Sequence, residues 1–333
     1  MFIVENYTLA VIFAFITMLC WGSWANTQKL AGKTWRFELY YWDYVIGIVL
    51  LAILSAFTIG NIGNVGRPFL ADLQQAATYN ILNAMFGGLI FNLANILLVA
   101  AIAIAGMSVA FPVGIGIALV LGVLVNYIAT PYGNPIILFS GIALVTIAII
   151  LDARAYSRLV ANKEKVSGKG LLLSLAAGFL MALFYRFVAR SMSDDFVNPL
   201  PGKLTPYTAV FFFSLGILIS NFIFNTYLMR KPVEGKPVSF KDYFSGSFGI
   251  HLTGILGGVI WCIGMSLNII AAGKAGYAIS YGLGQGATLI AALWGVFIWR
   301  EFKGAPKGTN TLLAFMFLFF LFGLGLIVYA GVR

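Results

Sequence analysis

Amide side chains at helical spacing are the residues of this sequence best suited to bind a small polar molecule. Asn92 and Asn95 lie three residues apart in one apolar run, Asn268 lies in a second run and Gln285 in a third. Residues three apart share a helix face, and an amide offers donors and acceptors together, which suits a neutral, polyfunctional solute. The same amides could instead join helices, at about 0.6–2 kcal/mol per hydrogen bond. We expect Asn92, Asn95 and Gln285 to line a cavity, with Asn268 as a further candidate.

Tryptophan and tyrosine side chains could complete such a site. An indole stacks on a flat ring or on the apolar face of a sugar, and it donates one N–H. A tryptophan in the middle of an apolar run is informative, whereas tryptophans near the end of a run are equally typical of the aromatic belt at a membrane surface. A tyrosine four residues before Gln285 shares its helix face. The candidates are Trp21, Trp24 and Asn26 near the end of one run, Trp261 in the middle of another, and Tyr281.

Two ionisable residues fall inside apolar runs, where a charge is expensive and a function is the first hypothesis. Asp43 lies among aromatic residues. A partly desolvated carboxylate there could take up and release a proton, or Asp43 could be an interfacial residue held by Arg36. Arg186 could offer a donor fork to substrate carbonyls, or it could snorkel to the membrane surface near Arg190. We expect Asp43 to carry a coupling proton, and both interpretations of Arg186 stay open.

No constellation for covalent or metal chemistry accompanies these residues. His251 is the single histidine and has no cysteine beside it in the sequence, and Cys20 and Cys262 both fall inside apolar runs. A zinc site, a histidine-based triad and a disulfide framework are therefore not expected. Neither a cofactor nor enzymatic activity is predicted. We expect Glu301 to pair with a local basic residue such as Lys303 rather than with a ligand.

The apolar runs that carry these residues are long enough to cross a bilayer. Hydrophobic residues make up 61% of the chain, charged residues 10%, and the mean hydropathy is +0.94. About 20 apolar residues form a helix that spans the bilayer core, and a helix satisfies its own backbone groups in lipid. We predict an all-α membrane protein with ten transmembrane helices, at residues 7–30, 39–59, 79–102, 108–128, 135–151, 170–189, 207–229, 248–271, 277–299 and 311–330.

An internal repeat divides these spans into two sets of five. When the chain is shifted by 170 residues, the glycine pairs at 87–88 and 257–258 align, and so do the Gly-x-Gly sequences at 114–116 and 284–286. Since five is an odd number, the second set enters the membrane from the opposite side and the two repeats are inverted. Inverted repeats are a recurrent design of secondary transporters, which bind their substrate between the halves. The predicted halves are 1–151 and 170–333, with a cytoplasmic linker at 152–169.

Basic residues predict the orientation of the chain. With the amino terminus outside, the inside loops hold fifteen Lys and Arg residues and the outside segments hold five. Cytoplasmic loops carry the excess of basic residues in membrane proteins. We therefore predict a multi-pass protein of the inner (plasma) membrane with both termini outside the cytoplasm. The net charge of +10 is explained by this topology, and no nucleic-acid partner is expected.

Three stretches resemble the ureide permease family of the drug/metabolite transporter superfamily. They are Trp-Gly-Ser-Trp at 21–24 followed by the aromatic stretch at 38–44, the stretch 202–213 with its Lys-Leu-Thr-Pro-Tyr sequence, and 275–301, from Ala-Gly-Tyr-Ala through Trp-Gly to Glu. The resemblance covers almost the whole chain, although the loop between the fifth and sixth spans is much shorter than in the plant proteins. The five-plus-five layout is also similar to the glucose/ribose porter branch. The resemblance implies the drug/metabolite transporter fold and proton-coupled uptake of ureides such as allantoin, of nucleobases, or of monosaccharides.

Together these features predict a secondary active, proton-coupled transporter that imports a small neutral polar metabolite such as a ureide, a nucleobase or a monosaccharide. An exporter of drugs or amino acids is one alternative, and a passive facilitator or channel is another. Apart from Asp43, no predicted span interior holds a carboxylate, which disfavours the export of cationic drugs. The expected partners are the solute, the coupling proton and the lipid bilayer, and the oligomeric state stays open.

Overall fold

Ten membrane-length helical spans make up most of the computed structural model, which describes residues 1–32, 35–105, 107–159 and 167–332. The predicted all-α fold class is confirmed. Two short helices between spans, α4 (Phe69–Gln75) and α10 (Phe240–Phe244), were not predicted. The spans are α1 (Tyr7–Ser23) with α2 (Asn26–Ala31), α3 (Phe37–Phe57), α5 (Thr78–Ala105), α6 (Met107–Ala129), α7 (Pro135–Ser157), α8 (Gly168–Ser191), α9 (Pro206–Arg230), α11 (Phe248–Ala275), α12 (Tyr277–Gly284) with α13 (Ala287–Leu293) and η1 (Trp294–Ile298), and α14 (Thr309–Ala330).

Polar caps mark where several spans begin. The Asn6 side chain accepts a hydrogen bond from the Leu9 backbone N–H at the start of α1. Asn134 caps α7 in the same way, and Pro135 occupies the first helical position, where a missing N–H is harmless. Ser167 caps α8. Such caps satisfy backbone donors that have no partner within the helix, so these spans begin close to where the sequence predicts.

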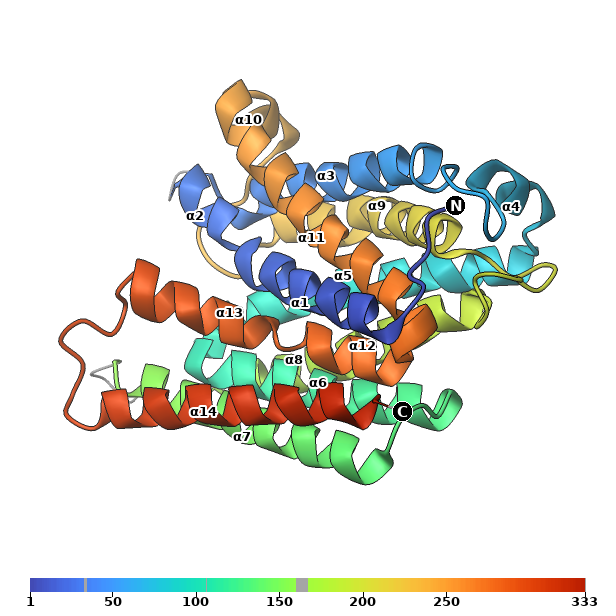
Figure 1. Cartoon of the computed structure of the whole chain (residues 1–333). Helices are drawn as coiled ribbons and strands as arrows, with labels where there is room; N and C mark the ends of the chain where they lie inside the picture. The colour runs from blue at the N-terminus through green and yellow to red at the C-terminus, as the bar shows by residue number, and fades with distance from the viewer. Residues whose placement is uncertain (33–34, 106, 160–166, 333) are drawn as a thin grey trace.

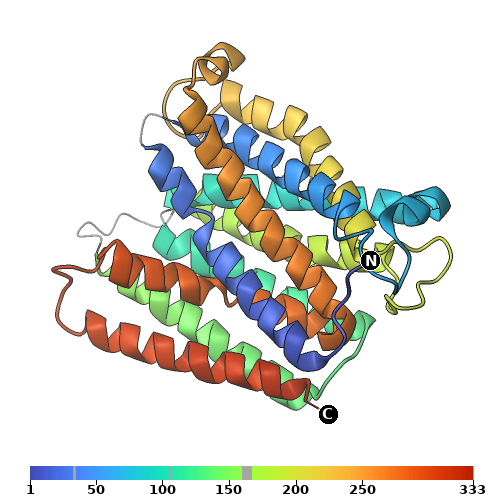
Figure 2. The same cartoon turned by 45° about the horizontal axis from the view of Figure 1, so that its top comes forward.

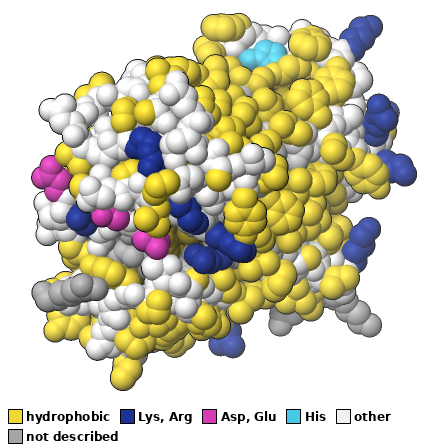
Figure 3. Space-filling view, turned by 90° about the vertical axis from the view of Figure 1, so that its right-hand side faces the viewer, with side chains coloured by type: hydrophobic (Ala, Val, Ile, Leu, Met, Phe, Trp, Pro, Cys, Tyr) yellow, Lys and Arg dark blue, Asp and Glu magenta, His cyan; other side chains and the backbone are white. Residues whose placement is uncertain are grey.

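The outer surface of the bundle is apolar, as a surface in contact with lipid tails must be. Large hydrophobic side chains are exposed on many spans, for example Leu54 on α3, Ile223 on α9 and Phe322 on α14. Figure 3 shows a field of hydrophobic side chains between a zone with both acidic and basic side chains and an opposite edge with Lys and Arg. This pattern is typical of a band of lipid contact between two polar ends.

The helix packing follows an inverted repeat. Helix α1 packs on α11 as α8 packs on α5, and α3 packs on α11 as α9 packs on α5. The pairs α3–α9, α6–α12 and α7–α14 each join one span to its counterpart in the other half. Helices α7 and α14 lie side by side in both views (Figures 1 and 2). These exchanged contacts are what a pseudo-two-fold axis between two five-span sets produces.

Glycines of the sequence repeat lie at equivalent crossings of this bundle. A Cβ atom on Gly88 of α5 would collide with the Phe213 carbonyl oxygen of α9, and one on Gly258 of α11 would collide with the Tyr44 carbonyl oxygen of α3. Only a residue without a side chain permits such a close backbone approach between membrane helices. The alignment of 87–88 with 257–258 therefore corresponds to two structurally equivalent contacts.

Three predicted spans differ from the structure in ways that matter for the site. Helix α7 continues to Ser157, past the predicted end at residue 151, so Asp152 lies within a span. The ninth span is not one continuous helix, because α12 ends at Gly284, α13 begins at Ala287, and η1 follows as a π-helical turn. The first span is also interrupted, between α1 and α2. The mean hydropathy of a span does not predict where its helix is interrupted, although polar Gln285 lies at one of the two breaks.

Both termini lie at the same end of the bundle (Figure 1). The Tyr7 hydroxyl at the start of α1 donates a hydrogen bond to the Val328 carbonyl oxygen near the end of α14, at 2.5 Å. We call the end with the termini, α4 and residues 192–205 the terminal end. The opposite end, with α2, α10 and residues 299–308, is called the basic end.

Candidate functional site

A cavity of about 170 Å³ lies between the two halves of the bundle. Helices α1, α5, α6, α8, α11 and α13 contribute residues to it, as does the break between α12 and α13, so both sets of five spans build its wall. Its described lining contains no Asp, Glu, Lys, Arg or His. The lining residues are Trp21, Gly22, Trp24, Ala25, Phe91, Asn95, Leu98, Ile115, Met181, Phe184, Trp261, Gln285, Ala287, Thr288 and Ala291.

Five of the residues singled out from the sequence line this cavity. They are Trp21, Trp24, Asn95, Trp261 and Gln285. The interruptions of the first and ninth spans lie at the same place, because Trp24 and Ala25 separate α1 from α2 and Gln285 separates α12 from α13. Discontinuous membrane helices commonly form substrate sites, since they bring backbone polar groups to a cavity. The breaks therefore mark this cavity as the candidate binding site.

Two amides supply the polar part of the wall. The Asn95 Nδ2 group donates to the Tyr41 hydroxyl oxygen at 3.1 Å, and among the described residues its Oδ1 has no hydrogen-bond donor. The Gln285 side chain has no hydrogen bond to any described residue and is 8% exposed. Each amide can thus offer at least one acceptor, and Gln285 also offers N–H donors, to a solute in the cavity.

An aromatic cluster forms the apolar part of the wall. The Trp261 ring lies 4.4 Å from the Phe91 ring and 5.9 Å from the nearly parallel Trp21 ring, measured between centroids. Trp261 is 5% exposed, so most of its ring surface is used in packing. Trp21 also donates its indole N–H to the Trp261 carbonyl oxygen at 3.2 Å. Trp24, which packs on Tyr44 at 4.7 Å, is half-buried and leaves more ring surface for a flat solute.

Asn92 is not in the cavity wall, although it shares a helix face with Asn95. It is fully buried; its Oδ1 accepts from the Tyr41 hydroxyl at 2.9 Å, and its Nδ2 donates to Ser220 Oγ at 2.9 Å. Tyr41 in turn accepts from Asn95. Asn92 therefore positions Tyr41, and Tyr41 positions the amide that does reach the cavity.

Asn268 and Tyr281 also serve packing rather than the cavity wall. Asn268 Nδ2 donates to the Ser280 carbonyl oxygen at 2.7 Å and so joins α11 to α12. The Tyr281 hydroxyl donates to the carbonyl oxygen of Met181, a wall residue, at 3.0 Å. Both side chains are fully buried. Their hydrogen bonds fix the positions of α12 and α8 beside the cavity.

Asn26 and Arg186 lie away from the solute cavity. Asn26 Oδ1 accepts from the Trp299 indole N–H at 2.7 Å and borders a neighbouring cavity at the basic end. Arg186 is half-buried in α8 near the terminal end, within electrostatic range of Arg190 and Asp194. This position agrees with the snorkelling interpretation of Arg186, and it places its charge outside the described cavity wall.

Asp43 lies in a cluster that the sequence does not reveal. Its Oδ1 accepts from the Tyr243 hydroxyl at 2.6 Å and lies 2.8 Å from His251 Nδ1. The rings of His251 and Trp35 meet edge to face at 5.1 Å. The suggested partner Arg36 is instead paired with Glu38, at 2.6 Å. His251 is 208 residues from Asp43 in sequence, so only the fold brings the two together.

Glu301 also has partners other than the predicted one. Lys29 Nζ lies 2.8 Å from its Oε1, and the Tyr156 hydroxyl donates to its Oε2 at 2.7 Å. Lys303 is therefore not its ion-pair partner. The contacts bring together α2, α7 and the residues after η1 at the basic end.

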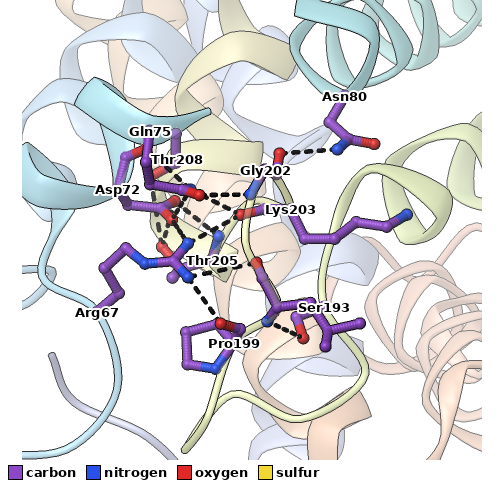
Figure 4. A network of polar contacts seen from close by, with 11 residues as sticks. Arg67, Asp72, Gln75, Asn80, Ser193, Pro199, Gly202, Lys203, Thr205 and Thr208 are labelled. Atoms are coloured by element: carbon purple, nitrogen blue, oxygen red, sulfur yellow. Dashed lines mark hydrogen bonds and ion pairs between the residues drawn. The ribbon is translucent and has the colours of Figure 1, made fainter. Parts of the chain in front are cut away.

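A buried polar network holds the terminal end together (Figure 4). Asp72 of α4 is fully buried; it accepts from Arg67 at 2.8 Å, from Gln75 at 3.0 Å and from the Thr205 backbone N–H at 2.7 Å. Arg67 also donates to the carbonyl oxygens of Pro199 and Lys203. The network ties the segment before the third span to the loop before the seventh span, and thus one half to the other.

The solute cavity continues toward the basic end. A cavity of about 460 Å³ shares Trp24, Ala25, Asn95 and Leu98 with it and extends to Arg36 and Glu234. Another, of about 160 Å³, shares Gly22 and Ala25 with it and extends to Lys29. The two neighbouring cavities therefore lie on the side of the solute cavity that faces away from the terminal network.

Known proteins agree with this architecture. A family model described as "Ureide permease" matches residues 40–169 and 157–330. Ureide permease 1 and ureide permease 2 of Arabidopsis thaliana are 25% and 27% identical to the chain, and each match covers 96% of the chain and 96% of the relative. A solved structure described only as "Crystal structure of protein" matches with a TM-score of 0.58 at 15% identity, over 97% of this chain and 96% of that one, which supports the fold. Since the family model matches most of the chain, this protein belongs to the ureide permease family and is a membrane transporter, not an enzyme.

Proposed function

We propose that this transporter imports a small neutral polar solute by proton-coupled alternating access, and that ureides are its first candidate substrates. The observation that carries the proposal is the uncharged cavity between the halves, with indole rings, one partly free amide and one fully free amide in its wall. A cationic drug or a zwitterionic amino acid would have to leave its charge unpaired there, which is costly. A neutral ring with several N–H and C=O groups fits this lining.

The names of the relatives narrow the proposal further. The Arabidopsis thaliana relatives are ureide permeases by name. A ureide or a nucleobase presents a flat face to Trp24 and polar edges to Asn95 and Gln285. A monosaccharide could use the same amides and would place its apolar face on the indole. Ureides and nucleobases are therefore placed before ribose and glucose.

Uptake into proteoliposomes tests this function. Labelled allantoin, uracil, ribose and glucose are offered with and without an imposed inward proton gradient. We expect counterflow exchange for allantoin or uracil and concentrative uptake only with the gradient. Preferred transport of a cationic drug or an amino acid would contradict the proposed substrate class. Exchange that no proton gradient drives would identify a passive facilitator or another coupling ion.

The sequence suggested Asp43 as the residue that couples proton movement to solute uptake. Its contacts with His251 and Tyr243 give it two groups through which a proton could pass. The cluster lies at the start of α3 and α11, where the two halves cross. An Asp43→Asn protein should keep counterflow and lose proton-driven uptake if Asp43 holds the coupling proton.

A further inference from the structure

A second cavity at the basic end borders the proposed solute site and, unlike it, contains charged residues. Its volume is about 160 Å³, and it lies between α2, α6, α7 and the end of the ninth span. It shares Gly22, Ala25, Thr288 and Ala291 with the wall of the solute cavity. The two cavities therefore have part of their lining in common. An ion bound in one cavity would therefore lie next to a solute bound in the other.

Asp152 is the unusual group in this second cavity. It lies in α7, which continues through it to Ser157. Its Oδ1 is buried and has no hydrogen-bond partner, and no described residue forms a hydrogen bond to its other carboxylate oxygen. An ionised carboxylate without a partner in a membrane span is expensive to keep. A cation that binds to Asp152 during the transport cycle would offset this cost.

The groups around Asp152 leave it uncompensated. Glu301, the other carboxylate of the cavity, has both oxygens bonded, to Lys29 and to Tyr156. Although burial alone would raise the pKa of Glu301, the hydrogen bonds from Lys29 and Tyr156 hold that pKa below its usual value. Glu301 is thus a fixed negative charge whose partner is Lys29. Its field adds to the cost of a second negative charge at Asp152.

Within the part of the chain that the structure describes, the other helices packed against α7 do not supply a counter-charge. Helices α6 and α14 contain no acidic or basic residue. The indole N–H groups of Trp294 and Trp299, which line the cavity, are already bonded to Ser23 and Asn26. Arg154, two residues along α7, forms no ion pair with a described residue. The carboxylate of Asp152 is therefore an acceptor of this cavity that no described residue satisfies.

We propose that Asp152 binds the coupling proton, beside the solute cavity, in preference to Asp43. This inference rests on the proposed proton-coupled function. The proton adds to the carboxylate and later leaves it, with no other bond made or broken. A proton needs only the carboxylate of Asp152, whose oxygens have no hydrogen-bond donor among the described residues, so the site can accept it without further ligands. Asp43 also has one buried oxygen, Oδ2, without a partner among the described residues, but its Oδ1 already has Tyr243 and His251 as partners, and the residue lines none of these three cavities.

Matched substitutions separate the two carboxylates. Asp152→Asn, Asp43→Asn and Glu301→Gln remove one charge each and keep the side-chain shape, and Asp195→Asn, in an exposed loop of the terminal end, is the control. Each protein is assayed in proteoliposomes for counterflow and for uptake driven by a proton gradient, with the panel member that the parent protein exchanges. We expect Asp152→Asn to keep counterflow and lose the stimulation by the proton gradient. The Asp195→Asn protein should behave like the parent.

The outcomes distinguish this inference from the proposed function. If the parent protein exchanges no solute or ignores the proton gradient, the proposed function fails. If the parent is proton-driven, and Asp152→Asn remains so while Asp43→Asn does not, Asp152 is excluded and Asp43 is the coupling residue. Stimulation of the parent by a sodium gradient alone would also overturn the assignment of a proton to Asp152.

A measurement without solute keeps the inference testable if uptake is weak. Trp294 and Trp299 line the cavity of Asp152, so a change in its protonation should alter tryptophan fluorescence. We expect a fluorescence transition between acidic and alkaline pH that Asp152→Asn removes and Asp43→Asn retains. Retention of the transition in Asp152→Asn, together with its loss in Asp43→Asn, would overturn the assignment.

Discussion

Asn92 and Asn95 show how two identical side chains on one helix face can take different roles. The spacing predicts that both point the same way, and both do reach the Tyr41 hydroxyl. One turn of α5 decides the difference, because it places Asn92 against α9 and Asn95 against the cavity. Periodicity can predict a shared face, but not which members of the face a neighbouring helix covers.

At the residue scale, we predict opposite effects for alanine at these two positions. Asn95→Ala should weaken solute affinity roughly fivefold to thirtyfold, as expected for about 1–2 kcal/mol of lost hydrogen bonding. Asn92→Ala should remove the acceptor of the Tyr41 hydroxyl and a donor to Ser220 Oγ, and destabilise the protein by about 1–3 kcal/mol. Thermal unfolding in detergent and solute binding to the same preparations measure both effects. Equal losses of affinity and stability in the two variants would contradict the division of roles.

The sequence alone does not predict which residues, far apart along the chain, form ion pairs and hydrogen bonds. Local sequence suggests Arg36 for Asp43 and Lys303 for Glu301, because neighbours in sequence are near in space. The structure instead pairs Asp43 with His251 and Glu301 with Lys29, across 208 and 272 residues. Only the packing of α3 on α11 and the approach of α2 to the residues after η1 create these contacts. The residue types were recognised as candidates, and their partners were not.

At the element scale, close helix crossings should tolerate no added volume. Gly258 of α11 contacts the α3 backbone, whereas a Cβ atom on Gly325 of α14 meets nothing within 4 Å. We predict that Gly258→Ala destabilises the protein by about 1–3 kcal/mol through overpacking. Gly325→Ala should be neutral or slightly stabilising, since alanine favours a helix by about 1 kcal/mol relative to glycine. Thermal unfolding of the pair in one detergent checks this, and equal melting temperatures would contradict the crossing.

The terminal network makes a second prediction at this scale. Asp72 is fully buried and paired with the half-buried Arg67, so Asp72→Ala removes the carboxylate that accepts from Arg67 and from the buried Thr205 N–H, at a cost of about 1–3 kcal/mol. We expect the loops that the network joins to separate. A Ser193→Cys probe, buried in the parent, should then react with an impermeant maleimide only when Asp72→Ala is also present. The assay uses a protein in which Cys20 and Cys262 are replaced. Equal labelling of the Ser193→Cys probe with and without Asp72→Ala would show that the network does not hold this end closed.

The whole molecule presents related contacts at its two ends. At the terminal end, Arg67, between the second and third spans, donates to carbonyl oxygens between the sixth and seventh spans. At the basic end, Arg36, between the first and second spans, donates to the carbonyl oxygens of Glu234 and Lys236, between the seventh and eighth. A shift of five spans converts one pair of loops into the other. Two halves related in this way can exchange equivalent arrangements, which is the physical basis for alternating access.

Hydropathy and the repeat predicted this level of organisation well. Ten spans and their inversion follow from the length of apolar runs and from an odd number of spans in each repeat. The breaks at Trp24 and Gln285 were not predictable in the same way, because the overall composition of a span does not reveal where its helix is interrupted. The sequence therefore indicated the architecture and five of the fifteen residues of the cavity wall, and only the packing of the helices adds the others.

At the scale of the whole molecule, we predict that both termini face away from the cytoplasm. They lie at the terminal end, while most Lys and Arg residues lie in loops of the opposite end, which the positive-inside rule assigns to the cytoplasm. The two cavities that border the solute site would then lie on its cytoplasmic side. A carboxy-terminal reporter that is active only in the cytoplasm should stay silent, and the same reporter inserted between spans five and six should be active. The two reporters should lie on opposite sides of the membrane, because five spans separate them. The reverse result would assign the terminal end to the cytoplasm, and the basic end with its cavities to the outside.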